Sequence, residues 1–315
     1  MNIFATVLTY TAPSANYRGE SAENRAVIQK ITNGRFEFPI ISPESIRNAV
    51  RETLGALGAP CNRKRLHDEE QLAVSFHDYP DADKYADDFF MGWLVAASGA
   101  DRKKIHKELE EKGRDVKSFS FKRDSVLRMN MAVGLEPYRH DTVFTQSPQD
   151  KTPPANKLHK NADNSQLLHR ETAFTAFQYP FALNLEECRE KAEWTKILLK
   201  AIGQLNNVAG NHARSYFEMA PASIVLRLTP QLVAGFDTYG FRVGDKGQHT
   251  LSEIIDGILE GDYPGSEFYL GGKIVKDMDD KLKNELKAKG VTIENSPQKL
   301  LETVGNIAFS PEKVG

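Results

Sequence analysis

Five aspartates lie in one short stretch of this chain: Asp78, Asp81, Asp83, Asp87 and Asp88. Clustered carboxylates hold Mg²⁺ in nucleases and phosphotransferases, so this stretch is the first candidate for chemistry. Pro80 interrupts it, and no regular pattern of apolar residues spans it. We therefore predict an acidic loop with capping residues, and the alternative is a metal-dependent nuclease that uses Asp81, Asp83, Asp87 or Asp88.

Other catalytic patterns are missing from the sequence. Cys61 and Cys188 are the only cysteines, lie far apart, and have no base beside them in the sequence. No GxSxG elbow, phosphate-binding P-loop or GxGxxG after a strand occurs. The eight histidines are scattered and form no HExxH pair. The sequence predicts no catalytic residue, no metal site and no cofactor.

A small-residue segment over residues 208–216 carries groups that suit a phosphate. Gly210 leaves backbone N–H groups accessible, and Asn211, His212 and Arg214 follow it as polar or basic side chains. Such a loop can cradle an oxyanion. The alternative is a structural turn in which Asn211 acts as a cap.

A helix that begins after Ser42 carries the second group of candidate residues. Ser42 is a good N-cap, Pro43 suits the first helical position, and Gly58 suits the end of the helix. Arg47 and Arg51 lie one turn apart, away from the apolar stripe Ile46, Val50, Leu54 and Leu57. These arginines either bind phosphates or are solvated helix charges paired with Glu44 or Glu52.

The composition is that of an ordinary folded protein, but the charges are unevenly distributed along the chain. The 315 residues are 40% hydrophobic and 27% charged, with a formal net charge of −2. Residues 101–170 hold fifteen Lys and Arg against ten Asp and Glu, whereas residues 230–315 hold ten against fourteen. A basic middle and an acidic tail favour either a binding face or a head-to-tail self-association surface, and a solvated surface with chance fluctuation is the alternative.

No leader and no membrane-spanning run are visible, so we predict a cytoplasmic protein.

The elements that would position these residues follow one another in a recognisable order. Strands are predicted at residues 3–9, 125–133, 174–185 and 223–229, and helices at 42–58 and 186–206. Further helices are predicted at 87–97 and 103–112, and in the tail near 251–259, 279–289 and 298–304. The first six elements have the order strand, helix, strand, strand, helix, strand, which is the α+β, ferredoxin-like order of RRM domains.

Three segments together resemble a known family. The approach to the first helix, RFEFPIISPESIRNAVR over residues 35–51, is similar to the segment with which backbone subunits of type I CRISPR effectors enter their first helix. The strand VLRMNMAVGLEP over residues 126–137 and the loop over 210–214 are similar to the DevR (Cst-type) branch of that family, the CRISPR-associated autoregulators of subtype I-B. The three segments occur in the family's order, and the resemblance extends over most of residues 1–230.

The resemblance implies an RRM-like (ferredoxin-like) palm with two insertions. The palm would comprise residues 1–58, 125–136 and 172–230, the fingers insertion residues 59–124, and the thumb loop residues 137–171. Residues 231–315 would form a C-terminal extension packed on the palm. The acidic tail matches the family less clearly.

The resemblance also implies a guide-RNA-binding, non-catalytic backbone subunit of a Cascade complex. Its partners would be a CRISPR guide RNA, target DNA through that guide, neighbouring copies of itself, and a small Cas-five-like and a large subunit, with no membrane. The implied RNA-binding residues are Ser42, Ser45, Arg47, Asn48, Arg51, Gly210, Asn211, His212 and Arg214.

Cleavage would need a residue that this chain lacks at the expected place. Related type III backbone subunits cut RNA with an aspartate between the first strand and first helix, and here no aspartate precedes Asp68. A stand-alone RRM-like regulator of single-stranded RNA is the remaining alternative, and it would need exposed aromatic side chains on the sheet.

Overall fold

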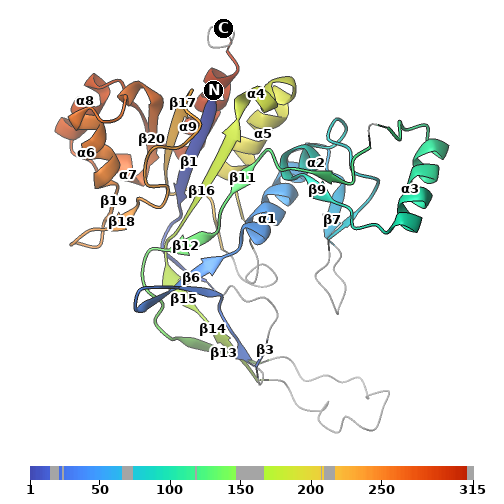
Figure 1. Cartoon of the computed structure of the whole chain (residues 1–315). Helices are drawn as coiled ribbons and strands as arrows, with labels where there is room; N and C mark the ends of the chain where they lie inside the picture. The colour runs from blue at the N-terminus through green and yellow to red at the C-terminus, as the bar shows by residue number, and fades with distance from the viewer. Residues whose placement is uncertain are drawn as a thin grey trace.

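A large mixed sheet forms the centre of the molecule (Figure 1). The computed structural model describes residues 1–14, 21–22, 25–65, 74–117, 119–146, 167–206, 208 and 217–310. The strands of the sheet are β1 (Asn2–Leu8), β5 (Lys30–Asn33), β6 (Phe36–Ile41), β11 (Arg128–Met129), β12 (Ala132–Gly134), β16 (Phe177–Asn184), β17 (Ser223–Thr229), β20 (Phe268–Gly272) and β21 (Thr292–Glu294). Their order is β21-β20-β17-β1-β16-β12-β6-β5, and β11 also pairs with β16. The predicted α+β class is confirmed.

The first strand of the chain lies in the middle of this sheet. β1 pairs antiparallel with β16, where Ile3 faces Leu183, and antiparallel with β17, where Ile3 faces Leu228. β12 continues the sheet beyond β16, whereas β20 and β21 continue it beyond β17 and pair parallel with each other. The central order is therefore β17-β1-β16-β12, with antiparallel neighbours throughout.

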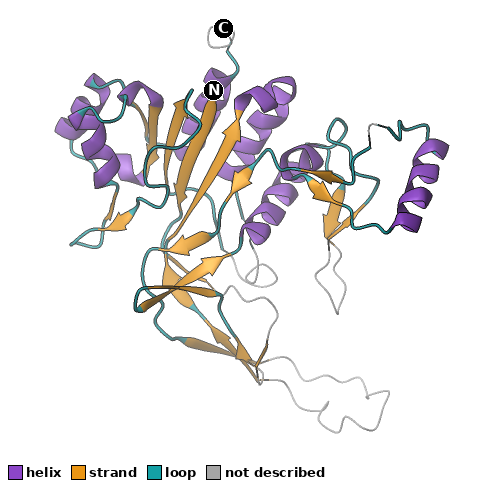
Figure 2. Ribbon diagram, viewed as in Figure 1, coloured by secondary structure: helices purple, strands orange, loops and turns teal. Residues whose placement is uncertain are grey.

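Helices cover both faces of the sheet (Figure 2). The helices are α1 (Pro43–Ala56), α2 (Ala86–Met91), α3 (Gly99–Glu111), α4 (Leu185–Cys188), α5 (Ala192–Gly203), α6 (Ser252–Glu260), α7 (Lys273–Lys276), α8 (Asp280–Ala288) and α9 (Pro297–Ala308). Apolar residues of α1, α5 and α9 pack on one face of the sheet, and those of α6, α7 and α8 pack on the other. The predicted helix over 186–206 is divided into α4 and α5 by a short 3₁₀ turn, Arg189–Lys191.

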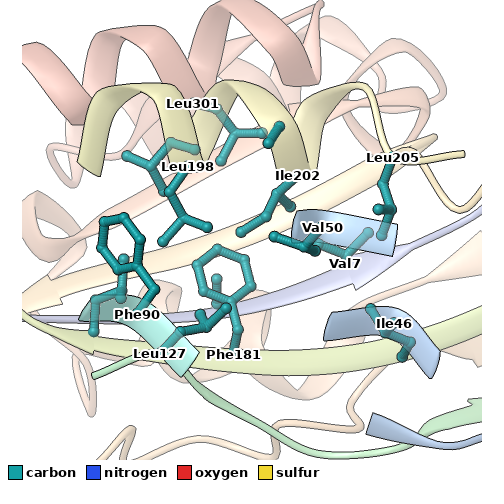
Figure 3. Packing of buried hydrophobic residues seen from close by; sticks show 14 of the residues in the cluster. Val7, Ile46, Val50, Phe90, Leu127, Phe181, Leu198, Ile202, Leu205 and Leu301 are labelled. Carbon is teal, nitrogen blue, oxygen red and sulfur yellow. The ribbon is translucent and has the colours of Figure 1, made fainter. Parts of the chain in front are cut away.

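Local signals and burial together explain α1. The Ser42 Oγ accepts a hydrogen bond from the Ser45 backbone N–H, and Gly58 after the helix has a φ of 90°. Ile46, Val50 and Leu54 are fully buried against the sheet, as Figure 3 shows for the first two. Each such side chain stabilises the fold by roughly 1.5–3 kcal/mol. The predicted apolar stripe therefore faces the core.

The segment over residues 59–124 contains one helix that belongs to the main core. Ala86, Phe89, Phe90 and Met91 of α2 are buried in the same cluster as α1 and α5. The rest of this segment projects from the sheet (Figure 1). It contains α3 and the short strands β7 (Arg63–Arg65), β8 (Val74–Phe76), β9 (Trp93–Leu94) and β10 (Lys122–Arg123).

The predicted helix over residues 87–97 is wrong beyond Met91. Gly92 ends α2 with a φ of 61°, and β9 begins at the next residue. A Cβ atom on Gly92 would lie 2.3 Å from the Arg123 carbonyl oxygen and 2.8 Å from that of Asp124. The chain thus requires a glycine where α2 turns against the backbone at the end of β10.

Gly92→Ala is expected to lower the free energy of unfolding by about 1–3 kcal/mol, because the alanine meets both a left-handed backbone and a backbone clash. Gly113→Ala is the matched control, since Gly113 has a φ of 70° but no atom within 4 Å of an added Cβ. Thermal melting of both variants measures the difference. Equal melting temperatures would show that the clash at Gly92 is relieved by movement of the chain.

Small sheets lie below the central sheet in Figure 1. β13 (Thr142–Gln146) pairs antiparallel with β14 (Leu167–Glu171), β14 pairs parallel with β4 (Arg25–Ala26), and β4 pairs antiparallel with β3 (Ser21–Ala22). β2 (Ala12–Ser14) pairs with β15 (Ala173–Thr175). The Pro, Asn, Gln, Lys and Asp content of residues 145–168 predicts an exposed polar loop. Its two ends instead lie in β13 and β14, and residues 147–166 lie outside the described residues.

The C-terminal residues contribute to the sheet as well as to its cover. β20 and β21 extend the main sheet, a role that the sequence did not predict. The segment that precedes them holds the hairpin β18 (Arg242–Val243) and β19 (His249–Thr250), and a 3₁₀ turn, Gly265–Glu267. The three predicted tail helices correspond to α6, α8 and α9.

Candidate nucleic-acid interface

The N-terminus of α1 presents two hydroxyl groups that contact each other. The Ser42 Oγ lies 3.1 Å from the Ser45 Oγ and accepts the Ser45 backbone N–H at 3.2 Å. Both side chains are half-buried. The cap thus fixes the helix start immediately after β6, where the predicted RNA-binding residues begin.

Arg47 joins α1 to the end of α2 and to Ser125, which follows the projecting segment. Its Nη2 group donates to the Met91 carbonyl oxygen at 2.6 Å and to the Ser125 Oγ at 2.8 Å. Burial lowers the pKa of Arg47, and the nearby positive charge of Arg63 lowers it further. Arg47 therefore has a structural contact in addition to any role toward a ligand.

Arg51 is not a solvated helix charge, because only 6% of it is exposed. Its Nη2 group donates to the Asn48 Oδ1, and the Asn48 Nδ2 donates to the Glu52 Oε1 at 3.4 Å. Burial lowers the pKa of Arg51 first, followed by the positive charge of Arg63, while the charge of Asp87 opposes this. The Arg51 and Asn48 side chains are thus held together on one face of α1.

Arg63 belongs to the same cluster, although it is not among the predicted RNA-binding residues. Its charge acts on both Arg47 and Arg51, and Arg128 acts on Arg47. The Arg63 Nη2 contacts the Asp88 Oδ1 at 3.3 Å, and the buried Nε makes no hydrogen bond within the described part of the chain. Its position next to two other basic residues in the sequence was the one available signal.

Arg47, Arg51 and Arg63 lie together at the junction of α1, α2 and β7, beside the buried carboxylates of Asp87 and Asp88. Guanidinium groups that are held in place lose little freedom when they bind a phosphate. Five of the nine predicted RNA-binding residues lie on α1 or at its cap. The other four, Gly210, Asn211, His212 and Arg214, lie outside the described residues, so their convergence with Arg47 and Arg51 stays a prediction.

The acidic stretch is an anchor for the projecting segment. Asp87 and Asp88 are both 0% exposed. The Asp87 carboxylate accepts the backbone N–H groups of Asn62 (2.7 Å) and Arg63 (3.0 Å). The Asp88 carboxylate accepts the Asn62 Nδ2 at 2.8 Å and the Asp81 backbone N–H at 2.9 Å, and burial raises the Asp88 pKa.

The remaining aspartates of this stretch form ion pairs. Asp81 pairs with Arg114 at 2.8 Å, Asp83 with Lys191 at 3.4 Å, and Asp78 with Lys84 and Lys112. Across the described ranges, no three His, Cys, Asp or Glu residues form a group that could hold a metal ion. The carboxylates that the nuclease alternative requires are engaged with protein donors.

Cys188 is buried and Cys61 is half-buried. Burial raises the pKa of the Cys61 thiol to about 12 and that of the Cys188 thiol to about 11. A thiol with such a pKa is protonated near neutral pH and is a poor nucleophile. This fits a packing role for both thiols.

The sheet face opposite α1 is covered by the chain after β17. The Thr6 Oγ1 donates to the Thr238 carbonyl oxygen at 2.8 Å, and the Gln178 side chain exchanges hydrogen bonds with the backbone of Phe241 at 3.1 and 3.3 Å. Thr6, Gln178 and Val225 of this face are buried. Along these central strands the face therefore offers no exposed aromatic side chains of the kind that a stand-alone RRM uses to stack bases.

Among the helices within the described ranges, none is both long and apolar enough to cross a membrane.

Comparison with known proteins identifies the family of this chain. No family model matches it. The CRISPR-associated protein Cas7/Cst2/DevR of Myxococcus xanthus (strain DK1622) is 32% identical over 285 residues, which cover 88% of each sequence. A chain of a structure described as a CRISPR RNA-guided surveillance complex, pre-nicking, has a TM-score of 0.58 at 13% identity, with 98% of this chain and 100% of that chain covered.

A chain of a second CRISPR RNA-guided surveillance complex has a TM-score of 0.56 at 14% identity, with the same coverage. At these identities the two solved structures establish a shared fold. The relative from Myxococcus xanthus establishes the family, because its sequence identity to this chain extends over nearly the whole of both sequences. The chain belongs to the Cas7/Cst2/DevR family of CRISPR-associated proteins.

Proposed function

We propose that this protein is a guide-RNA-binding backbone subunit of a type I CRISPR Cascade complex. It would oligomerise along the guide RNA and present it for base pairing with target DNA, without catalysis of its own. The observation that carries this proposal is the family membership over 285 residues. The likeness of the fold to chains of RNA-guided surveillance complexes supports it.

The palm is proposed to be the RRM-like unit formed by β1, α1, the β11–β12 segment, β16, α5 and β17. The sheet order β17-β1-β16-β12, with antiparallel neighbours, supports this assignment, since it is the order of a split βαβ fold. The fingers correspond to residues 59–124 and the thumb to residues 137–171. The extension over 231–315 adds β20 and β21 to the palm's sheet.

The guide RNA is proposed to follow α1 and the loop over residues 210–214. Ser42, Ser45, Arg47, Asn48 and Arg51 would act from the helix, and Gly210, Asn211, His212 and Arg214 from the loop. The arginine cluster at the root of the fingers supports a phosphate-binding role for α1. Specificity would come from base pairing by the RNA, while the protein supplies charge and shape.

The two alternative functions are less well supported by the geometry. A metal-dependent nuclease would need accessible carboxylates, but Asp87 and Asp88 are buried and accept protein hydrogen bonds. A stand-alone RRM-like regulator would need an open sheet face, but the segment over residues 231–243 lies across that face. Neither arrangement conflicts with a backbone subunit.

Co-expression of the protein with a CRISPR array tests this function. Because each copy of a head-to-tail polymer would cover the same length of guide, nuclease treatment of the purified protein is expected to leave a ladder of evenly spaced RNA lengths. Gel electrophoresis of the extracted RNA measures the spacing. One short protected fragment on a monomeric protein would instead indicate the stand-alone regulator, and metal-dependent loss of the RNA would indicate a nuclease.

A further inference from the structure

A groove of about 340 Å³ lies between α5 and α9, which pack against each other. Exposed residues of both helices form its rims, whereas Leu198 and Ile202 of α5 point into the core instead (Figure 3). None of the residues predicted to bind RNA lines this groove. The function proposed above therefore assigns it no role.

The floor of the groove is apolar, and close packing of the two helices fixes its shape. Ile197 of α5 and Leu301 of α9 line it. A Cβ atom added at Gly203 would lie 3.3 Å from the Leu301 Cδ1, and one added at Gly305 would lie 3.3 Å from a leucine of α5. The Gln298 Nε2 of α9 also donates to the Gly203 carbonyl oxygen at 3.1 Å. The groove is thus preformed, so an occupant need not order it.

The rims of the groove carry an excess of unpaired positive charge. Lys200 of α5 and Lys299 of α9 are exposed, and neither forms an ion pair with any residue that the structure describes. Lys196 pairs with Glu193 at 2.7 Å, which neutralises both. Glu302 is the one rim carboxylate without an ion pair within the described ranges. Two unpaired ammonium groups, one on each rim, therefore face one unpaired carboxylate.

This combination matches a peptide segment that carries both aliphatic and acidic side chains. An aliphatic side chain would cover the apolar floor, and carboxylates on either side of it would meet Lys200 and Lys299. The whole chain has a formal net charge of −2, so an acidic segment is attracted to this groove more than to the surface at large. A nucleic-acid backbone would leave the apolar floor uncovered.

We infer that the groove between α5 and α9 binds an acidic segment of a protein partner, anchored by an aliphatic side chain. The inference goes beyond the proposed function and does not depend on RNA binding.

A fluorescein-labelled synthetic peptide of glutamates and leucines tests the charge of the groove, with fluorescence anisotropy as the measure of binding to the full-length protein. Lys200→Gln combined with Lys299→Gln removes two exposed ion pairs and is expected to weaken binding by roughly 2- to 30-fold. Glu302→Gln removes the unpaired negative charge and is expected to strengthen binding by about 1.5- to 5-fold. A peptide with lysines in place of the glutamates is expected to bind wild type least.

Asn306→Trp tests the location by filling the groove from α9. It is expected to weaken peptide binding by roughly tenfold or more, as loss of a buried aliphatic side chain would. Thr303→Trp is the matched control, because Thr303 is exposed on the same helix but does not line the groove. Unchanged thermal melting of both variants shows that the helices still pack.

Equal affinity for the acidic and basic peptides, or equal affinity of the two tryptophan variants, would overturn the inference and leave the proposed function standing. Displacement of the peptide by single-stranded RNA would assign the groove to RNA instead. Altered self-association of the lysine variants without peptide would assign it to a second copy of the chain. Either of these results would also overturn the inference.

Discussion

Asp87→Ala is expected to lower the free energy of unfolding by about 2–5 kcal/mol. The substitution leaves two buried backbone donors, those of Asn62 and Arg63, without their acceptor, and each such group costs about 1–3 kcal/mol. Asp87→Asn keeps one acceptor oxygen and is expected to lose roughly half as much. Thermal or urea unfolding of the purified variants measures both effects.

Asp83→Ala is the control for this prediction, since it comes from the same acidic stretch. The Asp83 side chain is 93% exposed and pairs with Lys191, so its removal is expected to cost only about 0–1 kcal/mol. If Asp87→Ala unfolded like Asp83→Ala, the buried carboxylate would not be the anchor of the projecting segment. An Asp87→Ala variant with wild-type stability and altered RNA cleavage would support the nuclease alternative.

Replacement of both Arg47 and Arg51 with alanine is expected to weaken binding of single-stranded RNA of any sequence by at least roughly tenfold per arginine at low salt. Each neutralised phosphate contributes about 0.7 to the slope of log K against log salt for a single strand, so the slope is expected to fall by about 1.4. Filter-binding or anisotropy titrations at several salt concentrations measure it. Arg214→Ala is expected to act in the same way if the loop joins the track.

The structural contacts of Arg47 make controls necessary here. Ser125→Ala removes an acceptor of Arg47 but leaves its charge, so it is expected to lower the melting temperature without changing the salt slope. Arg189→Ala removes an exposed arginine that pairs with Glu186 and is expected to change neither. Arginine variants with reduced stability and an unchanged slope would show that these side chains only attach α1 to the projecting segment.

Elements with local signals could be predicted from the sequence. Ser42, Pro43 and Gly58 mark α1 within a few residues, and the run over 223–229 corresponds to β17. The end of α2 could not be placed, because Gly92 turns the chain against Arg123 and Asp124, which lie some thirty residues away in the sequence. β20 ends in Gly271 and Gly272 and is buried on both faces, so it lacks the alternation that identifies a half-buried strand.

The candidate site also depends partly on local sequence and partly on contacts between residues that are far apart in the sequence. The position of Arg47 and Arg51 off the apolar stripe follows from helical periodicity. Their surroundings do not, because the partners of Arg47 are 44 and 78 residues away along the chain. Arg63 joins them only because the carboxylate of Asp87 holds its backbone beside α2.

The central place of β1 has a consequence for how the protein forms during synthesis. β1 is translated well before its neighbours β16 and β17, which end at Asn184 and Thr229. At about 5–20 residues per second, a ribosome needs roughly 10–45 s after β1 to supply the second of these strands. Both edges of this apolar strand stay open until β16 is complete at Asn184, and one edge stays open until β17 is complete at Thr229, so the nascent chain is expected to depend on chaperones.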